Sequence, residues 1–234
     1  MEKNDKHLYA KNKPVWVAVD CIIFGFDNEK LKQLLIKRNF EPEKGKWSLM
    51  GGFLEQNETL EGAAQRILFE LTGLKDIYLE QLFTYSEPNR DSAGRVISVA
   101  YYALININEY DLNLSKNHNA HWHEVDKIPD LIFDHNQMVE KARKRLQRKA
   151  ATQPIGFELL PKNFTLPQLQ LLYEAIYGKD LDKRNFRKNI LSSGLLIKQD
   201  EKNKEYSKKG AFLYQFDQNK YNELVEKGIT ITFN

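Results

Sequence analysis

The segment from Gly51 to Leu74 constrains the fold of this chain more than any other part of the sequence. Its apolar residues recur at the spacing of one helical face, at Leu60, Ala63, Ala64, Ile67, Leu68 and Leu71. Thr59 precedes them at a position that favours a helix N-cap, and Gly73 follows them where helices commonly end in a left-handed residue. The segment therefore predicts a glycine-rich turn, an acidic loop and one helix, in that order.

The residues on either side of this helix have the composition of strands. Two runs rich in Val and Ile, residues 15–26 and 31–37, are separated by a polar turn and predict a hairpin. After the helix, β-branched and aromatic residues over 76–85 and 95–107 predict two more strands around a loop that contains Pro and Gly. Asp134 is expected to cap a further helix that reaches Ala150. We therefore expect a first domain over residues 1–150.

Several residues of this domain stand in the register of the Nudix box, a pattern of Gly, Glu, Arg and a final Gly at fixed offsets. They are Gly52, Glu58, Arg66, Leu68, Glu70, Gly73 and Leu74. The domain thus resembles the Nudix family, which implies an α/β/α sandwich around a mixed sheet and places the chain in the α+β class. The resemblance also implies an ion pair between Glu58 and Arg66 that holds the loop onto the helix.

Two positions depart from that pattern, because Ile67 and Leu71 stand where Nudix hydrolases carry glutamate. Carboxylates one helical turn apart repel each other unless a divalent cation neutralises them, and that arrangement makes the family's magnesium site. With only Glu70 left, we expect no metal, no cofactor and no hydrolysis. The alternative is an active nucleoside-diphosphate hydrolase that recruits Glu55, Glu61 or Glu87 in place of the missing ligands.

A second domain is expected over residues 151–234, after a linker near Pro154 and Gly156. Thr165 and Asp182 each precede a short helical pattern, and Gly178 and Gly194 follow those patterns. A strand, a charged hairpin, a second strand and a last helix over about 219–226 come next. Two helices on a tight turn followed by a basic hairpin is the order of a winged helix-turn-helix domain.

The charges divide unevenly along the chain. Residues 1–140 hold 16 Lys and Arg against 22 Asp and Glu, whereas residues 141–234 hold 19 against 10. An acidic body joined to a basic module is typical of proteins that meet nucleic acid. Arg and Asn can read base edges in the major groove, and Lys suits phosphate. The DNA-binding candidates are Lys183, Arg184, Asn185, Arg187, Lys188, Lys204, Lys208 and Lys209.

A degenerate Nudix box followed by the segments 164–170 and 181–188 resembles the Nudix-related transcriptional regulators, the NrtR-like family. The resemblance implies a ligand-sensing Nudix domain, a homodimer and a palindromic operator in double-stranded DNA. It also implies control of NAD synthesis or sugar catabolism, with ADP-ribose or a pentose such as arabinose as the effector. Loss of the two glutamates favours the pentose-sensing, AraR-type branch. A pure interaction module is a third reading, but it does not explain why a pocket-forming fold is present.

Effector binding is assigned to a further set of polar, aromatic and glycine residues. In the loop 90–95, which resembles a segment of Nudix proteins that handle ADP-ribose, a forked guanidinium can grip phosphate or sugar oxygens. The alternative for that loop is a solvated hairpin tip. The candidates are Arg38, Trp47, Gly51, Glu55, Tyr85, Arg90 and Arg95.

The remaining features predict an ordinary cytoplasmic protein. No apolar run approaches the roughly 18 to 20 residues that span a bilayer, so no membrane partner is expected. Cys21 lies in an apolar run and is interpreted as a small buried hydrophobe. His121 and His123 stand at strand spacing and are interpreted as structural histidines.

Overall fold

The computed structural model describes residues 12–75, 77–107, 119–204 and 210–228. The larger sheet contains β1 (Trp16–Phe26), β2 (Leu31–Lys37), β3 (Trp47–Ser48), β4 (Met50–Phe53), β5 (Glu80–Tyr85), β6 (Val96–Asn106) and β7 (Ala120–Glu124). Its helices are α1 (Leu60–Thr72), the short 3-10 turn η3 (Val125–Lys127) and α3 (His135–Thr152). The remaining elements are η4 (Phe157–Leu159), β8 (Phe164–Thr165), α4 (Leu166–Tyr177), α5 (Lys183–Ser192), β9 (Leu196–Asn203), β10 (Ala211–Phe216) and α6 (Gln218–Glu226).

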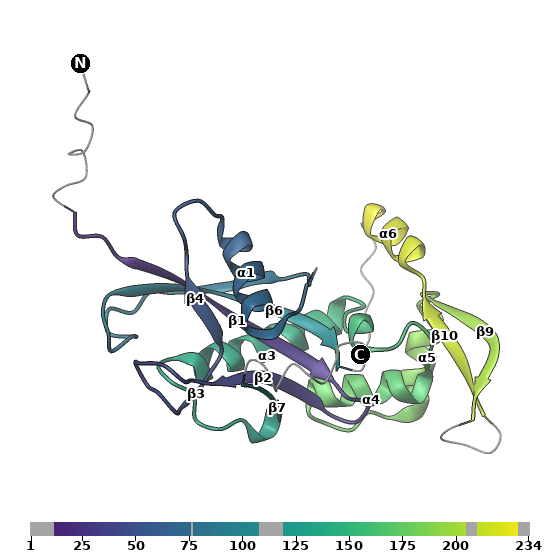
Figure 1. Ribbon diagram of the computed structural model, residues 1–234. Coiled ribbons are helices and arrows are strands. Elements are labelled where there is room, and N and C mark those ends of the chain that lie inside the picture. The colour runs from purple at the N-terminus through teal and green to yellow at the C-terminus, as the bar shows by residue number, and fades with distance from the viewer. Residues whose placement is uncertain (1–11, 76, 108–118, 205–209, 229–234) are drawn as a thin grey trace.

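The larger sheet is mixed, as expected for the α/β/α sandwich. Its strands run in the order β3-β2-β1-β6-β5, with β4 also paired to β1 and β7 paired to β2. β1 and β6 are parallel over their whole length, and every other pairing in this sheet is antiparallel. Figure 1 shows β9, β10 and α5 gathered at the end of the molecule opposite β3 and β4.

The two faces of β1 carry two separate cores. Val19, Cys21 and Ile23 pack in one cluster with residues of α1, so the prediction that Cys21 is a buried apolar residue is confirmed. On the alternate positions, Ile22 and Phe24 belong to a second cluster that runs through α3 into α4 and α5. A strand covered on both faces reads as a continuous apolar run, which explains the composition of this segment.

The predicted helix of the Nudix box is α1, and its ends are as the sequence indicates. Thr59 accepts a hydrogen bond from the backbone N–H of Gly62 at 3.1 Å, and Gly73 closes the helix with a φ of 76°. Ile67 is buried against the sheet, where a Cβ added at Gly52 would lie 3.0 Å from its Cγ1. Leu71 packs against the same cluster, so both positions where the Nudix resemblance implies glutamate are packing positions here.

Two element boundaries and one helix cap differ from expectation for identifiable reasons. β5 begins at Glu80, because Ile77 and Leu79 fill the cluster beneath α1 instead of joining the sheet. α3 continues to Thr152, so the domain boundary predicted after residue 150 falls in its last turn. Asp134 stands at the N-cap of α3, but its carboxylate makes no cap bond and binds a distant arginine instead.

The smaller part of the chain has the winged-helix order. Thr165 and Gln168 form a capping box at the start of α4, and Asp182 accepts from the N–H of Asn185 at the start of α5. β8, β10 and β9 form a three-stranded antiparallel sheet. The linker glycine, Gly156, has a φ of 88°, and a Cβ there would lie 3.2 Å from a Leu172 methyl carbon.

None of the described helices is long and apolar enough to cross a membrane.

Candidate functional site

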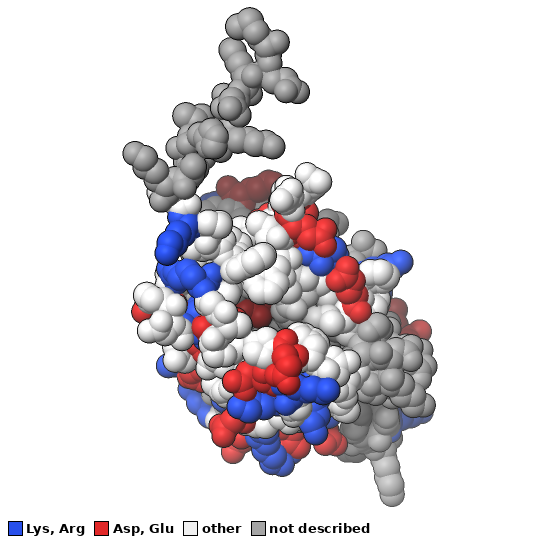
Figure 2. All heavy atoms as spheres, turned by 60° about the vertical axis from the view of Figure 1, so that its left-hand side comes forward, with Lys and Arg blue, Asp and Glu red and all other residues white. Residues whose placement is uncertain are grey.

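A cavity of about 440 Å³ opens on the first half of β1. Trp16, Ala18 and Asp20 line it, and these are alternate residues of one strand face. At about 3.3 Å per residue, the line from Trp16 to Asp20 spans about 13 Å. The loop 38–42, β4, the loop 90–94 and the start of α3 supply the other walls. Figure 2 shows this end of the molecule, with a hollow flanked by uncharged surface and by charged groups of both signs.

Asp20 forms the buried floor of this cavity. Asp20 is only 5% exposed, and its Oδ2 accepts a hydrogen bond from the Ser98 hydroxyl at 2.5 Å. A Cβ added at Gly51 would lie 2.2 Å from Oδ1 of Asp20, so the strand opposite must carry glycine at this point. Gly51 therefore allows the close approach of the backbone to a buried carboxylate.

His135, the first residue of α3, lies beside this carboxylate. The backbone N–H of Leu49 donates to its Nδ1 at 3.2 Å, so the neutral ring carries its proton on Nε2. Nε2 lies 3.6 Å from Oδ1 of Asp20. Burial lowers the pKa of His135, an effect that outweighs the opposing attraction of Asp20 and Asp134. The ring is therefore neutral at pH 7 and presents an N–H to the pocket floor.

Arg90 is held by a bidentate ion pair with Asp134. Its Nε and one terminal nitrogen donate to the two carboxylate oxygens at 2.9 and 2.6 Å, and the arginine side chain is 3% exposed. The same terminal nitrogen lies 3.8 Å from Asp20. Burial alone would lower the pKa of Arg90, but the bonds to Asp134 and the nearby carboxylates raise it overall. Arg90 thus links the loop 90–94 to the start of α3.

The mouth of the cavity is aromatic and carries one further guanidinium. Trp16 and Phe53 are 66% and 51% exposed, and their ring centroids lie 5.6 Å apart. Arg38 stacks over Phe40 and donates through Nε to the carbonyl of Pro42. Its terminal nitrogens make no hydrogen bond within the described part of the chain. An aromatic pair beside a free guanidinium suits a ligand with both a flat ring and an anionic group.

The structure brings only some of the predicted effector residues together. Arg38, Gly51 and Arg90 line the cavity. The others lie outside its lining: Trp47 packs edge-on against His121 and His123, Glu55 is exposed beside Arg66, Tyr85 packs against the core, and Arg95 donates to the carbonyls of Ser86 and Glu87.

Sequence reasoning missed most of the cavity lining, notably Asp20, His135, Trp16 and Phe53. One signal was present, because Asp20 is a charged residue inside an otherwise apolar strand. A buried charge without a sequence neighbour to pair with indicates a partner elsewhere in the fold. Ser98 and His135 are 78 and 115 positions away from Asp20 in the sequence. The parallel pairing of β1 with β6 brings Ser98 next to Asp20.

The carboxylates near α1 are committed to other contacts. Arg66 binds Glu58 at 2.6 Å and Glu70 at 3.3 Å, and it lies 3.8 Å from Glu55. The hydrogen bonds from Arg66 lower the pKa of Glu58 to about 2. Glu61 accepts from the Tyr101 hydroxyl. Across the described residues, no group of three or more His, Cys, Asp or Glu side chains is arranged to hold a metal ion.

Five polar side chains near the start of α5 form an exposed surface. Lys183, Arg184, Asn185, Arg187 and Lys188 are all exposed, while Phe186 and Ile190 turn into the core. None of these five side chains forms an ion pair with a described residue. We call these five residues the α5 face.

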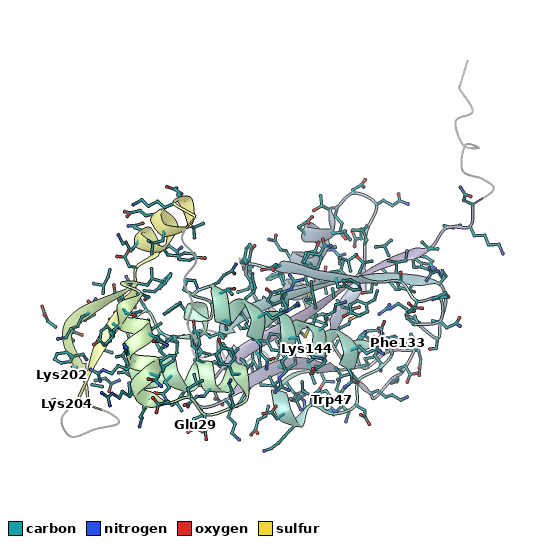
Figure 3. All side chains as sticks on the ribbon, turned by 180° about the vertical axis from the view of Figure 1, so that it is seen from behind. Glu29, Trp47, Phe133, Lys144, Lys202 and Lys204 are labelled. Carbon is teal, nitrogen blue, oxygen red and sulfur yellow. The ribbon has the colours of Figure 1, made fainter. Side chains whose placement is uncertain are left out.

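The wing adds lysines that stand over an aromatic ring. Nζ of Lys198 and of Lys202, on β9, lie 3.7 and 4.5 Å from the ring centroid of Phe212 on the neighbouring strand β10. Lys204 is exposed at the end of the described part of this hairpin, and Figure 3 shows it beside Lys202. Lys208 and Lys209 lie outside the described residues.

The basic residues of α3 behave differently, which corrects the interpretation of the charge asymmetry. Lys144 pairs with Glu140, Arg143 with Asp126, and both Arg145 and Lys149 with Glu80. Apart from Glu140, which is on α3 itself, these carboxylates belong to the first domain. Residues 151–234 alone hold 13 Lys and Arg against 10 Asp and Glu, so the winged helix is only slightly basic and its cations are concentrated on α5 and the wing.

The fold and site define a Nudix-type domain joined to a winged-helix domain. Sequence-family models agree, since the NUDIX domain matches residues 14–146 and the NrtR DNA-binding winged helix domain matches residues 156–216. The chain is 36% identical to the ADPR responsive transcriptional repressor NtrR of Acinetobacter baylyi, over 86% of this chain and 81% of that protein. The chain belongs to the NrtR family of Nudix-related transcriptional regulators.

Two solved structures extend the likeness. The crystal structure of Shewanella oneidensis NrtR complexed with a 27mer DNA is 32% identical and aligns with a TM-score of 0.77, covering 88% of this chain and 95% of that one. The NUDIX domain of the same protein complexed with ADP ribose is 34% identical, with a TM-score of 0.51, covering 59% and 96%.

Proposed function

We propose that this protein is an effector-responsive transcriptional repressor that binds operator DNA through the α5 face and the wing. The observation that carries the proposal is the contrast between two basic helices. The cations of α3 are mostly neutralised by carboxylates of its own chain, whereas no carboxylate in the described part of the chain pairs with the α5 face. Unpaired Arg, Asn and Lys on one exposed helix face match the donors that base edges and phosphates require.

The effector that fits the cavity best is ADP-ribose or a close analogue. The aromatic pair Trp16 and Phe53 suits a base, and the terminal nitrogens of Arg38 suit a diphosphate. The relative bound to ADP ribose and the ADPR responsive repressor support this choice. The loss of the two glutamates favours a pentose effector, but a free pentose has neither a base for the aromatic pair nor a phosphate for Arg38. We therefore place the pentose second.

The same proposal includes a homodimer and a division of the chain near residues 152–156. A two-fold dimer presents two α5 faces to a pseudo-palindromic site, with half-sites about one helical turn of DNA or a multiple apart. The left-handed Gly156 after the end of α3 is where the two domains can change their relative orientation.

We expect no diphosphohydrolase activity from the purified protein. Ile67 is buried, Leu71 packs against the core, and Arg66 holds Glu58 and Glu70, so the described residues offer magnesium no cluster of free carboxylates. The measurement is release of AMP from ADP-ribose in the presence of magnesium or manganese. A turnover of about 1 per second or faster would contradict the proposal and favour a Nudix hydrolase.

The α5 face and the wing are expected to contribute differently to DNA binding. Arg187→Ala should weaken operator binding by about 1 to 3 kcal/mol and relax its sequence preference, because a base contact is lost. Lys204→Ala should weaken the binding of every DNA sequence to a similar extent, because a phosphate contact is lost. The slope of the logarithm of the binding constant against the logarithm of the salt concentration should fall in magnitude by about one. Fluorescence anisotropy with operator and random duplexes over a salt series measures both effects.

Lys144→Ala is the matched control for that experiment, since Lys144 is an exposed helix lysine already paired with Glu140. Its operator affinity should equal that of the unchanged protein. If Arg187→Ala behaves like Lys144→Ala on the operator, the α5 face does not read the DNA.

A further inference from the structure

The cavity floor contains a buried acceptor and a buried donor that the proposed binding of base and diphosphate leaves unused. The Asp20 carboxylate receives one hydrogen bond from the described residues, the bond from Ser98 to Oδ2. The nearest other donors are too distant for good hydrogen bonds: His135 Nε2 lies 3.6 Å from Oδ1 and the Arg90 guanidinium lies 3.8 Å from Oδ2. A buried carboxylate with so few donors is costly unless a ligand completes its hydrogen bonding.

The chemistry of this floor selects a hydroxyl group. A sugar hydroxyl donates one hydrogen bond and accepts others, which matches a carboxylate oxygen beside an N–H. A phosphate offers mainly acceptor oxygens and carries negative charge, so Asp20 repels it. Arg90, the described cation that lies within 4 Å of Asp20, does not reverse this preference, because Asp134 already neutralises it.

The position of the floor within the cavity decides which part of a ligand reaches it. Trp16 is at the exposed end of the β1 face and Asp20 at its buried end, about 13 Å apart by strand geometry. A ligand whose base stacks at the mouth therefore reaches the floor with its opposite end. In ADP-ribose that end is the distal ribose, which ADP lacks.

We propose that Asp20 and His135 form a sugar-hydroxyl subsite that recognises the distal ribose of the effector and distinguishes it from nucleotides that end in phosphate. The subsite rests on the proposed function, since it assigns one end of the proposed ligand. Ser98 and Gly51 are positioning residues, because the first orients the carboxylate by a hydrogen bond and the second makes room for it.

The test compares ADP-ribose with ADP on the full chain by isothermal titration calorimetry. The unchanged protein should bind ADP-ribose at least about 10-fold more tightly than ADP, and Asp20→Asn should lose about 10-fold or more in ADP-ribose affinity, as expected for a hydrogen bond to a charged group. ADP affinity should change by less than about 3-fold, the effect of one weak contact. The matched control is Asp130→Asn, which alters an exposed carboxylate outside the cavity lining and should leave both affinities unchanged.

A second variant keeps the test decisive if Asp20→Asn fails to fold in a thermal melt. Ser98→Ala removes the hydroxyl that orients Asp20, and it should weaken ADP-ribose selectively while leaving ADP unchanged. Equal losses for both ligands, or no loss for either, would overturn the subsite while leaving ADP-ribose as the effector. If the unchanged protein binds no ADP-ribose, the proposed effector and its distal-ribose subsite both fail.

Free L-arabinose and D-ribose complete the experiment, because a pentose presents the same hydroxyl groups. Pentose binding that disappears in Asp20→Asn would support the hydroxyl subsite. ADP-ribose would give way to a sugar effector only if the unchanged protein bound the pentose and not ADP-ribose. Pentose binding that is unaffected by Asp20→Asn and by Ser98→Ala would overturn the assignment of the floor.

Discussion

Replacing Arg90 with methionine is expected to lower the free energy of unfolding by about 3 to 5 kcal/mol, the cost of breaking a buried ion pair from one side. Arg90 and Asp134 have side-chain exposures of 3% and 13%, so solvent screens their attraction little. The substitution leaves the mostly buried Asp134 and the buried Asp20 without their shared cation. Urea unfolding followed by circular dichroism measures the loss.

Arg95→Met is the matched control, since Arg95 lies in the same loop but is exposed and donates to two backbone carbonyls. Its cost should be about 1 kcal/mol or less. The double variant Arg90→Met, Asp134→Leu should recover part of the stability, because it removes the unpaired charge of Asp134 and leaves only that of Asp20. A cost for Arg90→Met no larger than that for Arg95→Met would contradict the assignment of a strong buried pair.

Local signals predicted the helices and the order of domains well. The caps at Thr59, Thr165 and Asp182 are short-range features, because each side chain bonds a backbone N–H three residues ahead. The periodicity of helices and strands is also local, because it depends on apolar residues that recur a few positions apart in one segment. The α5 face was predicted on that basis, and the structure places all five of its residues on the exposed side of one helix.

Long-range features were not predictable in the same way. Asp134 has the sequence context of a cap, yet a bidentate bond to Arg90, 44 positions away, replaces the cap bond. The cavity floor joins residues from β1, β6 and α3, and no local pattern shows that they meet. Charge was also misleading, because a count along the chain cannot show that Arg145 and Lys149 are neutralised by Glu80.

One strand face connects the cavity with the winged helix. The alternate residues Trp16, Ala18 and Asp20 line the cavity, and the next two on the same face, Ile22 and Phe24, join the core that includes α3 and α4. α3 follows the same path. Its first residue, His135, lies in the cavity wall, and Gln147 donates to the carbonyl of Ile176 at the end of α4. Figure 3 shows Phe133 and the wing lysines Lys202 and Lys204 at opposite ends of the molecule, with α3 between them.

This continuity predicts that ADP-ribose weakens operator binding, by about 5- to 150-fold for a typical coupling of 1 to 3 kcal/mol. A ligand that contacts Asp20, Arg90 or His135 acts on the start of α3, and packed elements transmit such shifts as rigid bodies. By linkage, saturating operator DNA must weaken ADP-ribose binding by the same factor. Anisotropy titrations of the operator with and without ADP-ribose give the first factor, and calorimetry with and without DNA gives the second.

Gln147→Ala tests whether α3 transmits the effect of the ligand to the winged helix, because it removes the hydrogen bond between α3 and α4 without altering the cavity or the α5 face. We expect it to reduce the coupling factor while leaving the affinity of the DNA-free protein for ADP-ribose unchanged. Arg148→Ala is the matched control, since the neighbouring Arg148 is exposed and its hydrogen bond stays within α3. If ADP-ribose binds the unchanged protein but leaves its operator affinity the same, the shared face of β1 and the helix α3 do not transmit the signal.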